Sequence, residues 1–80
     1  MAINKAIAPH LETVLANSYV LYTKTQNFHW NVTGSSFHSL HKMFEEQYTD
    51  LATAIDEIAE RIRTAGAKAP GCLAKYLAIA

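Results

Sequence analysis

The chain has 80 residues, half of them apolar and 18% charged, and its seven basic residues balance seven acidic ones. This composition is typical of a folded globular chain and argues against wholesale disorder or strong binding to a phosphate backbone. No apolar run is long enough to cross a membrane, no secretory signal opens the chain, and a single cysteine excludes an internal disulfide. We therefore expect a cytoplasmic protein of at most one domain.

The first expected helix covers residues 9–31, because no glycine and no further proline interrupts that stretch. Pro9 suits the first turn of a helix, where its missing N–H costs little. One face of the segment recurs at spacings of three and four: Leu11, Leu15, Ser18, Tyr22, Thr25 and His29. Three further apolar residues widen this face: Val14, Leu21 and Phe28. The residues that follow, up to position 36, have the composition of a turn.

The second expected helix covers residues 36–65 and is stopped by Gly66. Its apolar stripe has helical spacing and consists of Phe37, Leu40, Phe44, Tyr48, Leu51, Ile55, Ile58 and Ile62. Ser35 or Ser36 is available to cap its first turn. Residues 72–80 are expected to begin a short third helix. The predicted fold is therefore all-α, with the two long helices forming an antiparallel hairpin.

Ligand-type side chains border the apolar stripe of the second helix. On a helical wheel, three acidic residues lie within about 100° of His41, on the side away from the stripe. These residues are Glu45, Asp56 and Glu60. Ala52 and Ala59 fall almost in line with His41, where small side chains would let another helix approach closely. This face is expected to be a contact surface, separate from the face that packs on the first helix.

The acidic residues late in the second helix cannot reach His41 within one chain. His41 and Asp56 are 15 residues apart, which is roughly 22 Å along a straight helix. A second copy of the helix, antiparallel and related by a two-fold axis, would bring such residues together at two equivalent sites. His29 lies just before the turn, at the same end of the hairpin as His41. Each composite site would have two sources: from one chain His29, His41 and Glu45, and from the other Asp56 and Glu60.

A site with few nitrogens, several carboxylate oxygens and no thiolate suits iron or manganese, with zinc as a competitor. A structural interpretation stays open beside this one. His29 can be a buried structural histidine, and Asp56 and Glu60 can belong to a solvated acidic face. Trp30 and Tyr48 can likewise be core or interface aromatics. On that interpretation the chain is a helical assembly module with no redox role.

Three segments carry a resemblance to a known family. They are Asn27-Phe28-His29-Trp30-Asn31-Val32-Thr33-Gly34, then Leu40-His41 with Phe44-Glu45-Glu46-Gln47-Tyr48, and Asp56-Glu57-Ile58-Ala59-Glu60-Arg61. A His-Trp pair before a turn, a Leu-His pair early in the next helix and Asp-x-x-x-Glu-Arg late in it resemble the Dps family of starvation-induced mini-ferritins. The resemblance covers most of residues 9–80 and points to the N-terminal half of a ferritin-like domain.

The resemblance implies a four-helix bundle, to which this chain would contribute the first two long helices and the start of a short connecting helix. It also implies a dodecameric shell that oxidises ferrous iron, preferably with hydrogen peroxide, stores the ferric product and protects DNA. His29 and His41 match iron ligands from one subunit. Asp56 and Glu60 match ligands from its two-fold partner. Glu45 matches an acidic position near the second iron. Trp30, which follows His29 in the sequence, matches an aromatic residue beside the iron centre of the family.

Two features depart from the family. Members of the family typically have two further long helices. Whether a second polypeptide or more of the same protein supplies these helices stays open. DNA binding in the family commonly uses a basic terminal tail, whereas residues 1–8 carry only Lys5. We expect no direct DNA binding from this segment, and a DNA-compacting protein is the third interpretation. The wide apolar stripes predict self-association, because a core of this size supplies only about 3–5 kcal/mol.

Overall fold

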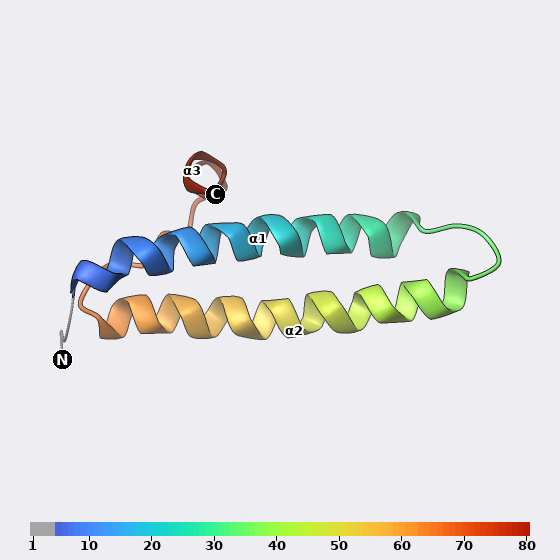
Figure 1. The fold of residues 1–80 in the computed structure, drawn as a ribbon, viewed down its shortest axis with the longest axis horizontal. Helices are drawn as coiled ribbons and strands as arrows, with labels where there is room; N and C mark the ends of the chain where they lie inside the picture. Colours follow the sequence, from blue (N-terminus) through green and yellow to red (C-terminus); the bar gives the residue numbers. More distant parts are fainter. Residues whose placement is uncertain (1–4) are drawn as a thin grey trace.

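The structure is a computed structural model that describes residues 5–80, and over this range it is helical throughout apart from the connections (Figure 1). A short 3-10 turn, Lys5–Ile7, leads into α1 (Ala8–Asn31), followed by α2 (Phe37–Thr64) and α3 (Leu73–Ile79). Helices α1 and α2 lie antiparallel along their whole length, and α3 packs on α1 at the end remote from the turn. The expected all-α hairpin with a short third helix is therefore confirmed.

A glycine with a positive φ lies in each of the two segments that follow the long helices. Gly34 has a φ of 102° in the turn between α1 and α2, and Gly66 has a φ of 93° just after α2. Around Gly66, its own N–H donates to the carbonyl of Arg63 and the Ala67 N–H donates to the carbonyl of Ile62. This pair of bonds is the Schellman motif, which satisfies the last carbonyls of a helix. Ser36 occupies the N-cap of α2, as expected, but its side chain makes no capping hydrogen bond.

The hydrophobic core lies at the end of the hairpin where α3 returns. Its buried members come from all three helices: Leu15, Ala16, Ile55, Ile62 and Tyr76. Leu15 and Ile62 are the largest side chains that are completely buried. Tyr76 attaches α3 to this core, because its hydroxyl donates a hydrogen bond to the carbonyl of Pro70 and its ring stacks on Tyr19. The core therefore fixes the alignment of α1 and α2 far from the turn.

The turn end of the hairpin is more open. Phe28 and Phe44 contact each other across the helices at 5.7 Å between ring centroids. Phe37, expected in the core, is 38% exposed and stands at the first residue of α2. Along α1 the residues Val14, Leu21 and Phe28 are about half exposed (48%, 53% and 53%). No helix among residues 5–80 combines the length and the hydropathy needed to cross a membrane.

Candidate metal centre

Two histidines face each other across the hairpin near the turn. His29 lies in the last turn of α1 and His41 in the second turn of α2, so the short connection brings them to the same level. The Nδ1 atom of His29 lies 2.7 Å from the carbonyl oxygen of His41, and the Nδ1 atom of His41 lies 2.8 Å from the carbonyl oxygen of His29. A carbonyl only accepts hydrogen bonds, so each Nδ1 carries a proton and donates it.

These reciprocal bonds determine which nitrogen can bind a metal. A neutral imidazole with its proton on Nδ1 has a free lone pair on Nε2. A backbone carbonyl that accepts from the other ring nitrogen is the usual support of a metal-binding histidine, because it fixes both tautomer and orientation. His29 and His41 thus combine a structural role with a free ligand atom each.

The two imidazoles stack on each other, and this arrangement determines how many metal ions they can bind. Their centroids are 3.6 Å apart and their planes differ by 20°. A histidine lone pair lies in the plane of its ring, so an ion held in one plane lies well outside the other. One ion therefore cannot take both rings as good ligands. The geometry suits two neighbouring ions, one for each histidine.

Aromatic rings enclose this histidine pair on both sides. Phe37 stacks on His41 at 5.0 Å with planes 19° apart, and Tyr48 places its edge against His29 at 5.2 Å and 71°. His29 is 7% exposed, whereas His41 is only half-buried. Phe37 and Tyr48 therefore each add one aromatic contact to the histidine pair.

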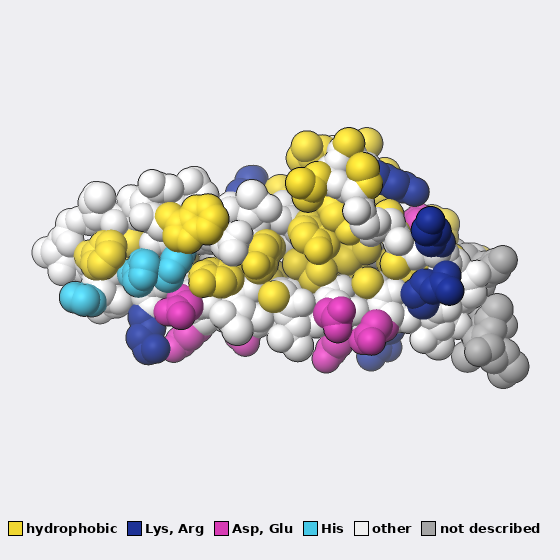
Figure 2. Space-filling model, turned by 180° about the vertical axis from the view of Figure 1, so that it is seen from behind, with side chains coloured by type: hydrophobic (Ala, Val, Ile, Leu, Met, Phe, Trp, Pro, Cys, Tyr) yellow, Lys and Arg dark blue, Asp and Glu magenta, His cyan; other side chains and the backbone are white. Residues whose placement is uncertain are grey.

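The acidic residues expected at the site are not gathered beside both histidines. Glu45, Asp56 and Glu60 are all exposed on α2. Asp56 lines a hollow of about 370 Å³ on the surface, together with Ala52 and Ala59. Figure 2 shows acidic side chains in two places along the border of the apolar surface, one beside the histidines and one further along the hairpin. Within residues 5–80 no three metal-binding side chains come together in one chain.

Comparison with known proteins assigns the chain to a family. The sequence matches the ferritin-like domain over residues 9–80. It is 49% identical over 76 residues to DNA protection during starvation protein 2 of Bacillus anthracis, a match that covers 95% of this chain and 52% of that protein. The crystal structure of a Dps protein from Vibrio cholerae superposes with a TM-score of 0.93 at 41% identity. This chain belongs to the Dps family of ferritin-like proteins.

The match to other Dps proteins is partial in length. The chain spans about half the length of the relatives it matches: 52% of the Bacillus anthracis protein and 55% of the Vibrio cholerae chain. The superposition on the Vibrio cholerae chain includes 99% of the residues of this chain. The DNA protection during starvation protein of Brevibacillus brevis shows the same proportion, with 43% identity over 95% of this chain and 51% of that protein. The Vibrio cholerae protein is described as a ferritin-like diiron-carboxylate protein. These proportions fit the N-terminal half of a Dps domain.

Trp30 and Tyr48 lie differently with respect to the histidine pair of this Dps chain. Trp30, expected beside the centre, is 66% exposed and makes none of the ring contacts seen within residues 5–80. It follows His29 directly, so it points to another side of α1. Tyr48 contacts His29 instead. A spacing of seven residues between His41 and Tyr48, two turns on one helix face, is the sequence signal for this neighbour.

Proposed function

We propose that this chain is an iron-oxidising and iron-storing mini-ferritin subunit that protects DNA from oxidative damage. The observation that carries the proposal is the histidine pair, whose Nδ1 atoms are bound to carbonyls and whose Nε2 atoms are left for metal. The names of two relatives, DNA protection during starvation, support the protective role. A protein that protects DNA would act in the compartment that holds it, so we propose the cytoplasm.

The substrate in this proposal is ferrous iron, with hydrogen peroxide as the oxidant. Two ferrous ions give two electrons to one peroxide molecule, which yields two ferric ions and two hydroxide ions. Imidazole and carboxylate ligands suit iron, and a relative is described as a diiron-carboxylate protein. The comparisons give no support for zinc or manganese. Oxidation at this site would remove both reactants that produce hydroxyl radicals.

A second copy of the chain is needed to complete the site. Asp56 lies roughly 22 Å along the helix from His41, and three ligands do not meet within residues 5–80 of one chain. We propose that two α2 helices lie antiparallel about a two-fold axis, so that each histidine pair faces Asp56 and Glu60 of the other copy. The small side chains of Ala52 and Ala59 support this arrangement, because the surface is hollowed beside Asp56 and a side chain of the other copy can approach there.

Each side chain has a separate task in the composite centre. His29 would bind one ferrous ion through Nε2, and His41 would bind the other, with Glu45 one turn further along the same helix. Asp56 and Glu60 of the second copy would supply the carboxylates. Carboxylate oxygens favour the ferric state that forms, since hard anionic ligands suit the more highly charged ion. With the two further helices of the family present, this interface would belong to a dodecameric shell.

Complementation between inactive variants tests the composite site. His41→Asn keeps a donor near the position of Nδ1 but removes Nε2, and Asp56→Asn removes a carboxylate. Each variant alone should lose fast oxidation of ferrous iron by peroxide, followed as the ultraviolet absorbance of ferric products. After joint refolding, about a quarter of the wild-type sites should return, because half of random pairs are mixed and each mixed pair has one intact site.

The control variants are His10→Asn and Asp50→Asn, which change exposed residues of the same types outside the site. Both should keep the wild-type rate. Full oxidation by either site variant alone, or no recovery in the mixture, would contradict a centre shared between chains.

The structure also favours one alternative. The reciprocal bonds of His29 and His41 hold α1 to α2 without any metal, as expected of a non-catalytic helical assembly module. Absence of iron oxidation by a chain with both bonds intact would select this alternative. DNA compaction has less support, because the net charge is zero. Residues 1–4, which belong to the tail considered for DNA contacts, lie outside the described residues.

A further inference from the structure

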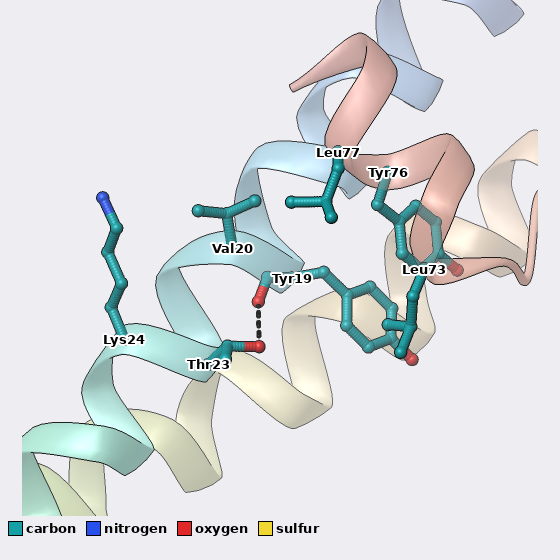
Figure 3. A pocket seen from close by; sticks show the side chains of 7 residues that line it. All are labelled: Tyr19, Val20, Thr23, Lys24, Leu73, Tyr76 and Leu77. Atoms are coloured by element: carbon teal, nitrogen blue, oxygen red, sulfur yellow. Dashed lines mark hydrogen bonds between the residues drawn. The ribbon is translucent and has the colours of Figure 1, made fainter.

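A groove runs between the middle of α1 and α3 and contains neither histidine of the pair near the turn (Figure 3). Its volume of about 350 Å³ lies within the range of about 300–1,000 Å³ that is typical of small-molecule sites. The lining is almost entirely apolar, and both helices contribute to it. Its apolar members are Tyr19, Val20, Leu73, Tyr76 and Leu77.

The two tyrosines give the groove a fixed shape. Tyr76 is buried, and its hydroxyl donates a hydrogen bond to the carbonyl of Pro70. Its ring stacks on that of Tyr19, with 4.4 Å between the centroids and 13° between the planes. A ligand therefore meets a surface that is already ordered, so ordering of the site takes little from the free energy of binding.

The α3 side of the groove presents exposed leucines. Leu73 is 70% exposed and Leu77 is 73% exposed, and the two lie one turn apart on α3. Exposed apolar surface beside a hollow favours an apolar occupant, because contact releases water from both surfaces. This side of the groove therefore suits an alkyl chain.

The groove also has one charged member. Lys24 is the only charged side chain in the lining. The ion pair found within residues 5–80 joins Lys42 to Glu46, so no carboxylate of those residues pairs with Lys24. Figure 3 shows Lys24 on one side of the set and Leu73 and Tyr76 on the other. A ligand that satisfies both sides has a negative head and an apolar tail.

We propose that this groove binds a long-chain carboxylate. The carboxylate lies at the ammonium group of Lys24, and the alkyl chain runs along the groove over Tyr19 and Tyr76. A phosphate head presents three strong acceptor oxygens, whereas the neighbouring Thr23 hydroxyl already donates to the carbonyl of Tyr19 and leaves the ammonium as the donor. A head with a single negative charge fits that supply. The inference concerns a surface apart from the iron chemistry and does not depend on it.

A helix of another chain is too large for the groove. An α-helix about 10 Å across occupies roughly 120 Å³ per residue at its rise of about 1.5 Å. The 350 Å³ of the groove would hold only about three such residues. An alkyl chain is one carbon wide and can follow the groove along its length. The size of the groove therefore favours a small amphiphile over a second copy of the chain.

Calorimetric titration of the full chain with sodium dodecanoate, below the concentration at which it forms micelles, tests the proposal. We expect saturable binding at a single site. Decanoate, which lacks two methylene groups, should bind about tenfold more weakly, because less apolar surface is buried. Lys24→Gln should weaken dodecanoate binding about threefold, as expected for an exposed charge pair. Lys68→Gln, which changes an exposed lysine outside the groove, should leave it unaltered. Absence of binding, or equal losses in the two lysine variants, would overturn the proposal.

Two substitutions of one leucine separate charge from apolar contact. Leu77→Glu and Leu77→Lys remove the same side chain, which is 73% exposed, so neither disturbs the core. A negative charge there repels the carboxylate, and a positive charge attracts it. Leu77→Glu should therefore weaken binding more than tenfold, and Leu77→Lys should bind severalfold more tightly than Leu77→Glu. Equal affinities in the two variants, or wild-type affinity in Leu77→Glu, would contradict the assigned site.

The position of the ligand is tested by nuclear Overhauser contacts, and the competing occupant by sedimentation. Methylene protons of dodecanoate should contact the ring protons of Tyr19 and Tyr76. Contacts confined to the half-exposed Leu21 and Phe28 on α1 would place the ligand elsewhere and overturn the proposal. If dodecanoate does not bind and Leu77→Glu converts an assembly into monomer, a second copy occupies the groove, and the proposal is wrong.

Discussion

At the scale of single residues, each imidazole of the histidine pair uses its two nitrogens for different purposes. Nδ1 holds the opposite helix through a carbonyl, and Nε2 is left for a ligand. The sequence places His29 and His41 at the same end of a hairpin, and this much follows from helical rise alone. The stacking and the reciprocal bonds could not be foreseen, because they depend on side-chain rotation within the packed hairpin.

The thiol of Cys72 shows another difference between sequence and structure. One cysteine without a neighbouring base predicts an inert thiol. In the structure Cys72 is exposed and precedes α3, where the backbone N–H groups of Lys75 and then Ala74 lower its pKa. These donors favour the thiolate, because they bind the charged form better than the neutral one.

Alkylation of Cys72 by iodoacetamide should therefore begin at lower pH in the folded chain than in urea. Below the ordinary thiol pKa the folded chain has more thiolate and should react faster, and the difference should vanish once both forms are fully ionised. The contribution of this group to stability has the same sign: it is present at high pH and lost as the pH falls through the lowered pKa. Identical pH profiles in both states would contradict the assignment.

At the scale of elements, the positions of glycine and proline predict both long helices closely. Breakers occur only near the ends of the expected segments, and α1 and α2 begin and end within a residue or so of them. The cap of α2 could not be predicted in this way. Ser36 is of a type that caps helices, but its φ of −96° and ψ of 18° are not the extended backbone that an N-cap residue typically has. Helix ends depend on local backbone angles, which composition does not determine.

The turn at Gly34 offers a test at this scale. Gly34 has a positive φ of 102°, and a Cβ atom added there would meet nothing within 4 Å. Gly34→Ala should therefore lower the free energy of unfolding by about 1–2 kcal/mol through backbone strain alone. Gly71→Ala is the matched control, since Gly71 has open space and no positive φ. Urea unfolding followed by circular dichroism measures both, and equal stabilities would contradict the explanation.

At the scale of the whole molecule, the hairpin is elongated, with extents of 51 × 22 × 15 Å, and has its core at one end. The wide apolar stripes are visible in the sequence, and the structure shows which part stays uncovered: Val14, Leu21 and Phe28, seven residues apart on α1. Which residues of a stripe are covered could not be read from periodicity, because it depends on the angle at which the helices pack.

This uncovered stripe predicts association of the chain. Wild-type protein should sediment above the monomer mass of 8.9 kDa, because burial of the stripe between chains removes apolar surface from water. Leu21→Glu should shift the population toward monomer by placing a charge in the stripe. Thr53→Glu, an exposed change on α2, should leave it unaltered. A stably helical wild-type monomer at micromolar concentration would contradict this prediction.

The reciprocal hydrogen bonds between the imidazoles and backbone carbonyls of His29 and His41 limit how the sequence of such a chain can evolve. The same two hydrogen bonds close the hairpin and orient the Nε2 atoms, so on the proposed function replacement of either imidazole would weaken both folding and iron binding. Glu45, Asp56 and Glu60 lie outside that constraint, at the exposed surface. Drift in metal preference or reaction rate would therefore arise through the carboxylates, while the imidazoles stay in place for the sake of the fold.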